Sequence, residues 1–68
     1  MTDPVRIDVL RDTSYVHGSA FVVYRNWHRI KGFAPSSTSR QEAIALAHEY
    51  AEDDRFAGFE VEVYLPQV

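Results

Sequence analysis

Residues 39–65, SRQEAIALAHEYAEDDRFAGFEVEVYL, decide the fold because they contain two different hydrophobic periods in succession. In the first part, apolar side chains recur at the spacing of one helix face. These residues are Ala43, Ile44, Leu46, Ala47, Tyr50 and Ala51. In the last part, apolar and polar residues alternate, which is the period of a strand. The segment therefore predicts a helix at about 39–54, a break at Gly58 and a strand at 59–65.

The start of this helix has a sequence signal of its own. Ser39 and Glu42 form the pattern Ser-x-x-Glu, in which each side chain bonds the backbone N–H of the other residue. We therefore expect Ser39 to be the N-cap and the helix to follow from Arg40.

Before the helix, three segments are typical of strands, at about 4–11, 19–26 and 28–33. Asn26 and Trp27 separate the last two as a turn, since asparagine tolerates left-handed backbone angles. The order β-β-β-α-β predicts a single α+β domain over residues 1–68. We expect a three- to four-stranded antiparallel sheet with one helix packed on one face, and the last strand beside the first.

Composition narrows the class of protein. The chain has 68 residues, 46% of them hydrophobic, which is enough for one small core and too much for a disordered tail. It has no cysteine, so it contains neither disulfide nor thiolate. No apolar run reaches the roughly 18 residues of a membrane span, and the N-terminal Met-Thr-Asp-Pro does not indicate a signal peptide. We expect a cytoplasmic protein that does not bind membranes.

Catalytic and metal-binding patterns are weak. His48 and Glu52 share one helix face, but no third ligand follows at a recognisable spacing for zinc. The serines before the helix lack a nucleophile elbow, and the glycines do not form a phosphate-binding pattern. A sheet with one helix also lacks the depth of a ligand-sized pocket. The sequence therefore predicts a protein that is not an enzyme and binds no metal or cofactor.

Charge is distributed unevenly along the chain. Residues 13–41 contain no acid and carry a net charge of +4, whereas residues 42–68 carry −6. Four acids, Glu49, Glu52, Asp53 and Asp54, lie at the C-terminal end of the helix, where the helix dipole disfavours anions. Either basic residues of the chain neutralise them and they aid solubility, or they form an acidic patch for a basic partner.

The basic middle of the chain supports an alternative. Arg25, Trp27, Arg29 and Lys31 interleave cations with an aromatic ring, as in surfaces that bind single-stranded nucleic acid by phosphate contact and base stacking. The overall net charge of −3 favours ordinary strand surface instead. Binding to single-stranded or duplex nucleic acid is thus the second hypothesis.

One helix covers only one face of the predicted sheet. The other face is expected to carry Tyr24, Trp27 and Tyr64 as apolar anchors for a partner or as a homodimer seam, unless they are scattered surface aromatics. With the acidic helix end, this face favours a protein-interaction domain.

Residues 20–51 resemble a class of small uncharacterised bacterial and phage domains, in which a hairpin leads to a capped, alanine-rich helix. The matching residues are Phe21, Val23, Arg29, Ser39, Glu42, Ala43, Ala47 and Ala51. The chain departs from that class by lacking a tryptophan in the first strand. In size and acidity it is also similar to phage-encoded inhibitors of host proteins, such as anti-CRISPR proteins. The resemblance implies a compact sheet-plus-helix domain and brings no catalytic residue.

Overall fold

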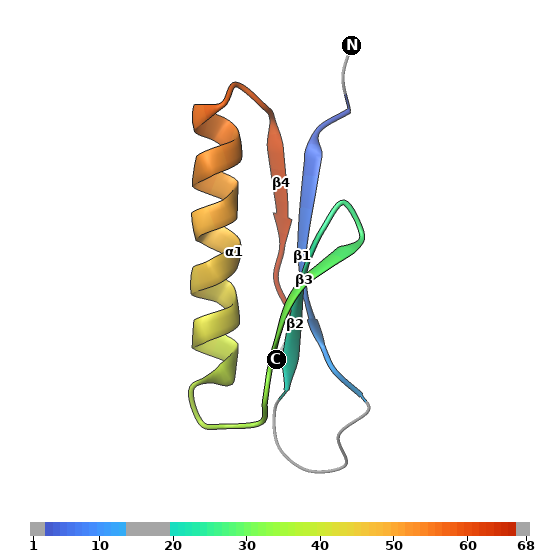
Figure 1. The fold of residues 1–68 in the computed structure, drawn as a ribbon, viewed down its shortest axis with the longest axis vertical. Helices are drawn as coiled ribbons and strands as arrows, with labels where there is room; N and C mark the ends of the chain where they lie inside the picture. The colour runs from blue at the N-terminus through green and yellow to red at the C-terminus, as the bar shows by residue number, and fades with distance from the viewer. Residues whose placement is uncertain (1–2, 14–19, 67–68) are drawn as a thin grey trace.

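A computed structural model of the chain describes residues 3–13 and 20–66. The elements, in chain order, are β1 (Val5–Arg11), β2 (Phe21–Arg25), β3 (His28–Phe33), α1 (Ser39–Phe56) and β4 (Val61–Tyr64). The helix stands against one face of the sheet, and none of the described elements covers the other (Figure 1). This confirms the predicted fold class. The beginning of the second strand, expected at residue 19, lies outside the described residues.

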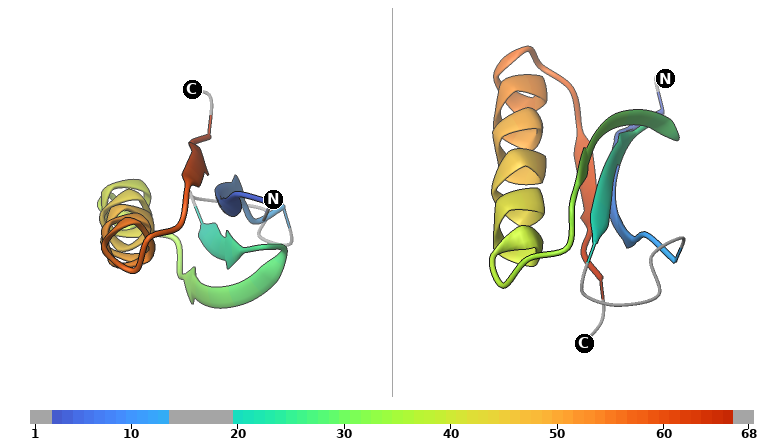
Figure 2. Two further views of the ribbon diagram at one scale, coloured as in Figure 1. Left: turned by 90° about the horizontal axis from the view of Figure 1, so that it is seen from above. Right: turned by 60° about the horizontal axis from the view of Figure 1, so that its bottom comes forward.

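The sheet has the order β3-β2-β1-β4, so β4 lies beside β1 as expected. The sheet is mixed, however, and the prediction of a purely antiparallel sheet was wrong in this one pairing. β1–β2 and β2–β3 are antiparallel, while β1–β4 is parallel. The cause is the direction of the chain, because β3 already runs in the direction of β1 and α1 then returns the chain, so that β4 starts in the direction of β1 again. Figure 2 shows the resulting curved sheet from above.

The predicted N-cap of the helix was also wrong. Thr38 occupies the N-cap position and makes no side-chain capping bond, while Ser39 is already the first helical residue. Ser39 is fully buried, and its hydroxyl donates to the Ser36 carbonyl oxygen at 3.1 Å. The Glu42 N–H donates to the Thr38 carbonyl at 2.9 Å, so Thr38 and not Ser39 accepts the first bond of the helix.

The opposite end of the helix extends beyond the expected boundary at 54. The helix continues to Phe56, and Ala57 and Gly58 then turn the chain toward β4. Gly58 has φ +98°, in the left-handed region that favours glycine. Residues 59–60 precede β4, although the Val5 N–H already donates to the Glu60 carbonyl at 2.8 Å.

The core lies between α1 and the sheet. Ala43, Ala47 and Ala51 are completely buried at every fourth position of the helix, so the helix backbone approaches the strands closely. On the sheet, the buried residues are Val5, Ile7, Val9, Phe21 and Val23. The alternation of β1 places Arg6, Asp8 and Leu10 on the open face, opposite the helix.

Candidate protein-interaction surface

An arginine stacked on two aromatic rings dominates one end of the open face. The guanidinium carbon of Arg6 lies 4.5 Å from the centroid of the Trp27 ring and 4.2 Å from that of Tyr64. These residues come from β1, from the β2–β3 turn and from β4, which the fold brings together across three strands. We call Arg6, Trp27 and Tyr64 the aromatic–arginine stack.

Asp8 holds the arginine of the stack in place. Arg6 Nε donates to Asp8 Oδ2 at 2.9 Å, and Arg6 Nη2 donates to Asp8 Oδ1 at 3.2 Å. Asp8 is only 2% exposed although it faces away from the helix. The hydrogen bond to Asp8 raises the pKa of Arg6 further above its ordinary value, so the guanidinium stays charged. The bidentate geometry restricts both side chains to one arrangement.

The turn that carries Trp27 is fixed to the same strand. The Arg6 N–H donates to the Asn26 side-chain oxygen at 2.9 Å, and the Asn26 N–H donates to the Arg6 carbonyl at 2.7 Å. Asn26 and Trp27 both have positive φ, 50° and 66°, as in the tight turns that join twisted hairpin strands. The predicted turn is therefore present. Trp27 occupies a position where glycine is usually preferred, and it remains 60% exposed.

Tyr64 completes the stack through a bond on its own strand. Its hydroxyl donates to Glu62 Oε2 at 2.9 Å. This hydrogen bond, with the negative charge of Glu62, raises the pKa of Tyr64 because both favour the protonated phenol. Tyr64 is 44% exposed, so both aromatic residues of the stack present accessible surface.

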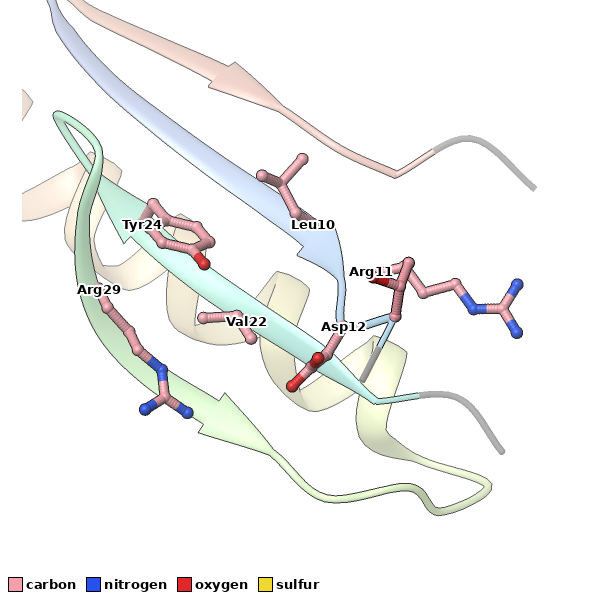
Figure 3. A pocket seen from close by; sticks show the side chains of 7 residues that line it. Leu10, Arg11, Asp12, Val22, Tyr24 and Arg29 are labelled. Carbon is pink, nitrogen blue, oxygen red and sulfur yellow. The ribbon is translucent and has the colours of Figure 1, made fainter. Parts of the chain in front are cut away.

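The open face also contains a hollow of about 250 Å³ between β1, β2 and β3. Apolar or aromatic residues of its lining are Leu10, Val22 and Tyr24, and the others are Arg11, Asp12, Thr13 and Arg29. The Arg11 side chain points away from the hollow (Figure 3). In Figure 3, Val22 lies between Tyr24 and Asp12, with Leu10 on one side and Arg29 on the other. We expected no ligand-sized pocket, and this hollow is smaller than the ~300–1,000 Å³ of small-molecule sites.

The acidic helix end is not uniform. Arg25 Nε and Nη2 donate to the two carboxylate oxygens of Asp54 at 2.9 and 2.8 Å, and the Asp54 side chain is 13% exposed. The hydrogen bond to Asp54 raises the pKa of Arg25. Asp54 is thus neutralised by the hairpin, as one of the two alternatives raised from the sequence has it, and its role toward a partner stays a prediction. The remaining three acids, Glu49, Glu52 and Asp53, are exposed.

The basic residues of the hairpin do not share one surface. Arg25 turns to the helix side and pairs with Asp54, whereas Arg29 pairs in register with Tyr24 on the open face. Lys31 lies opposite Val23, which belongs to the covered face, and its Nζ is 5.0 Å from the centroid of the Phe33 ring. A continuous cationic track through Arg25, Trp27, Arg29 and Lys31 is therefore absent from the described hairpin.

Three residues of the surface were not identified from the sequence as parts of a site. Arg6 and Asp8 carry opposite charges and lie two positions apart on a strand, so they share one face of the sheet. This spacing could have predicted their ion pair from the sequence. Phe56, the last residue of α1, is 97% exposed, and no periodic pattern in the sequence distinguishes it from a buried phenylalanine.

Across residues 3–13 and 20–66, no group of three or more histidine, aspartate or glutamate side chains is arranged to hold a metal ion. In the same ranges, α1 is too polar to cross a bilayer. Comparisons with known protein families, with curated proteins and with solved structures return no match to this chain.

Proposed function

We propose that this chain is a non-enzymatic protein-interaction domain that binds a partner protein through the open face of its sheet. The single observation that carries the proposal is the aromatic–arginine stack. Tryptophan, tyrosine and arginine are the residue types most enriched among those that dominate binding energy at protein interfaces. Here one of each lies at the same place, where the two rings are exposed and the half-buried Arg6 contacts both of them.

Hydrogen bonds within the chain order the stack. Asp8 fixes the guanidinium, Asn26 fixes the turn, and Glu62 fixes the Tyr64 hydroxyl. A surface that is already ordered loses little side-chain entropy on binding, which raises affinity for a given contact area. The left-handed backbone of Trp27 costs of order 1–3 kcal/mol, and such strain clusters at functional positions. Both properties favour a binding role for this ring.

Three exposed acids of α1 favour a partner with a basic surface. They are Glu49, Glu52 and Asp53. They lie on α1, which stands on the other side of the sheet from the stack, so we expect them to act through their long-range field on a basic partner rather than through the same contact (Figure 1). The role of a phage-type inhibitor, which rests on the resemblance in size and acidity alone, is a narrower form of the same proposal.

Affinity capture from a lysate of the organism that encodes the chain tests the proposal. The immobilised wild-type protein should retain one stoichiometric protein partner, and Trp27→Gly should lose it. Phe59→Ala is the matched control, because Phe59 is another exposed ring, 46% accessible, outside the stack. It should retain the partner as the wild type does.

Two results contradict the proposal. One is a partner that Trp27→Gly retains as well as the wild type. The other is recovery of nucleic acid instead of protein, with micromolar binding that weakens steeply with salt and is lost in Arg29→Ala, which identifies the alternative function.

A further inference from the structure

The outer edge of β4 has no strand beside it in the described part of the chain. The sheet order β3-β2-β1-β4 places β3 and β4 at its two margins (Figure 2). The Val5 N–H donates to the Glu60 carbonyl at 2.8 Å, and Val5 is in register with Val61. Because the backbone groups of a strand point alternately to its two sides, Glu62 bonds to β1, whereas Val61 and Val63 direct their N–H and C=O groups outward.

The two margins of the sheet differ in how they resist pairing. β3 carries Arg29 and Lys31, and its register with β2 shifts at a bulge. Charged side chains, lysine above all, and bulges are devices by which natural sheets keep an edge from pairing. β4 contains no lysine and no proline, and its register with β1 is regular throughout. The outer edge of β4 is therefore the margin that is open to another strand.

The side chains along β4 define the strand that would fit beside it. Val61 and Val63 pack against the core but stay partly exposed, and the following Leu65 is 43% exposed. Apolar residues of an added strand would cover this half-buried row. On the opposite face of β4, Glu60 and Glu62 are exposed, and no described lysine or arginine forms a salt bridge with either carboxylate. The edge thus presents apolar groups on one face of the sheet and negative charge on the other.

We propose that this edge binds an extended segment of the partner protein, which joins the sheet as a further strand. The segment has apolar residues at alternate positions, beside the apolar row of β4, and lysine or arginine between them, beside Glu60 and Glu62. Its backbone pairs with the outward N–H and C=O groups of β4, as in other cases of strand addition. The inference rests on the proposed function, because it names the chemistry of the partner at the strand that carries Tyr64 of the stack.

Charge selects this occupant over a second copy of β4. Two copies paired edge to edge would bring Glu60 and Glu62 of one molecule beside the same glutamates of the other, on one face of the joined sheet. Like charges across a strand pair are destabilising, whereas opposite charges stabilise it. A basic segment therefore fits where the chain's own β4 does not.

Amide exchange of the full chain, followed residue by residue by NMR, tests the edge. In the free protein, the Val61 and Val63 amides should exchange faster than those of Glu62 and Tyr64, which bond to β1. The probe is a short capped peptide of alternating lysine and valine. At millimolar concentration it should slow exchange at Val61 and Val63 by about tenfold or more. A peptide with glutamate in place of lysine should leave the exchange unchanged.

A charge reversal and a matched control locate the contact. Glu60→Lys should weaken binding of the lysine peptide by about threefold to tenfold, because repulsion across the strand pair replaces attraction. Glu49→Lys makes the same change in net charge at an exposed position of α1, and it should bind the peptide nearly as the wild type does. Both positions are exposed, so both variants should unfold at the wild-type temperature.

The inference is overturned if the lysine peptide leaves Val61 and Val63 unprotected, if the glutamate peptide protects them equally, or if the protected amides belong to β3. Protection in the free chain that grows with protein concentration would place a second copy at the edge and would also overturn it.

The edge and the stack can fail separately. Partner capture that Trp27→Gly loses and Glu60→Lys retains in full would overturn the edge and leave the proposed function standing. Protection by the lysine peptide, together with a partner that Trp27→Gly retains, would support the edge and contradict the stack. Trp27 lies in the β2–β3 turn, so Trp27→Gly should bind the peptide as the wild type does.

Discussion

The two faces of the sheet bury side chains by different means. Ile7 and Asp8 are neighbours on β1, and they point to opposite faces with exposures of 0% and 2%. Ile7 is covered by the alanine face of α1, whereas Asp8 lies on the face that α1 does not cover and is bonded by Arg6, whose guanidinium lies against Trp27 and Tyr64. A long side chain with an apolar stem can thus shield a strand where a second layer of structure is missing.

The difference matters because different interactions stabilise the two faces. The covered face depends on the removal of apolar surface from water, which requires close packing and tolerates little change. The open face depends on directed hydrogen bonds and stacking among groups that are partly wet. In residues 3–13 and 20–66, no buried side-chain nitrogen or oxygen lacks a partner, so the polar burial of Asp8 is fully satisfied. Substitutions on the two faces should therefore lower the free energy of unfolding by different amounts.

The largest effect is expected on the covered face. Ile7→Ala should lower the free energy of unfolding by about 2–5 kcal/mol, because it removes a fully buried side chain and leaves a cavity. Urea unfolding measured by circular dichroism checks this. Leu65→Ala, at a residue that is 43% exposed, is the control and should change stability much less. Equal losses in the two variants would show that the core is not where the structure places it.

The second effect is on the open face, at the adjacent position. Asp8→Ala should cost about 1–3 kcal/mol, since it removes two hydrogen bonds to a charged group while Arg6 can turn to water. Asp3→Ala, which removes an exposed carboxylate from the same end of the chain, should be nearly neutral. If Asp8→Ala costs no more than Asp3→Ala, the stack does not stabilise the open face.

The third change should separate stability from binding. Trp27→Gly relieves the left-handed backbone at φ 66° but loses the contact with Arg6 and adds freedom to the unfolded chain. These contributions are each about 1 kcal/mol, so the urea midpoint should move little. Partner capture should nevertheless be lost. A large loss of stability would instead identify Trp27 as a structural residue.

The smallest effect concerns the protonation of Tyr64. Because the hydrogen bond to Glu62 raises its pKa in the folded state, its contribution to stability is complete below the ordinary tyrosine pKa of about 10 and is lost as pH rises through the higher folded value. An absorbance titration of tyrosinate should show one group above the ordinary range. This group should be absent in Tyr64→Phe. A group that titrates at or below the ordinary value would contradict the bond to Glu62.

Much of the fold follows from the sequence alone. Periods of 2 and of 3.6 residues are local properties, so they identified the strands and the helix and showed which side chains share a face. The same reasoning placed Tyr24 and Tyr64 opposite the helix, and Asn26 made the turn predictable. Boundaries were less accurate, since Ser39 and Phe56 joined the helix through packing and a turn that no local pattern specifies.

Only the tertiary structure decided which residues meet. Arg25 and Asp54 are 29 positions apart, and Arg6, Trp27 and Tyr64 come from three distant segments, yet each set is in contact. Strand order and chain direction determine these pairs, and a period in the sequence specifies a face without specifying a neighbour. For that reason the sequence by itself determined a sheet with one covered face, whereas the three-dimensional structure decided that Asp54 is neutralised within the chain and that the stack and the hollow lie on the open face.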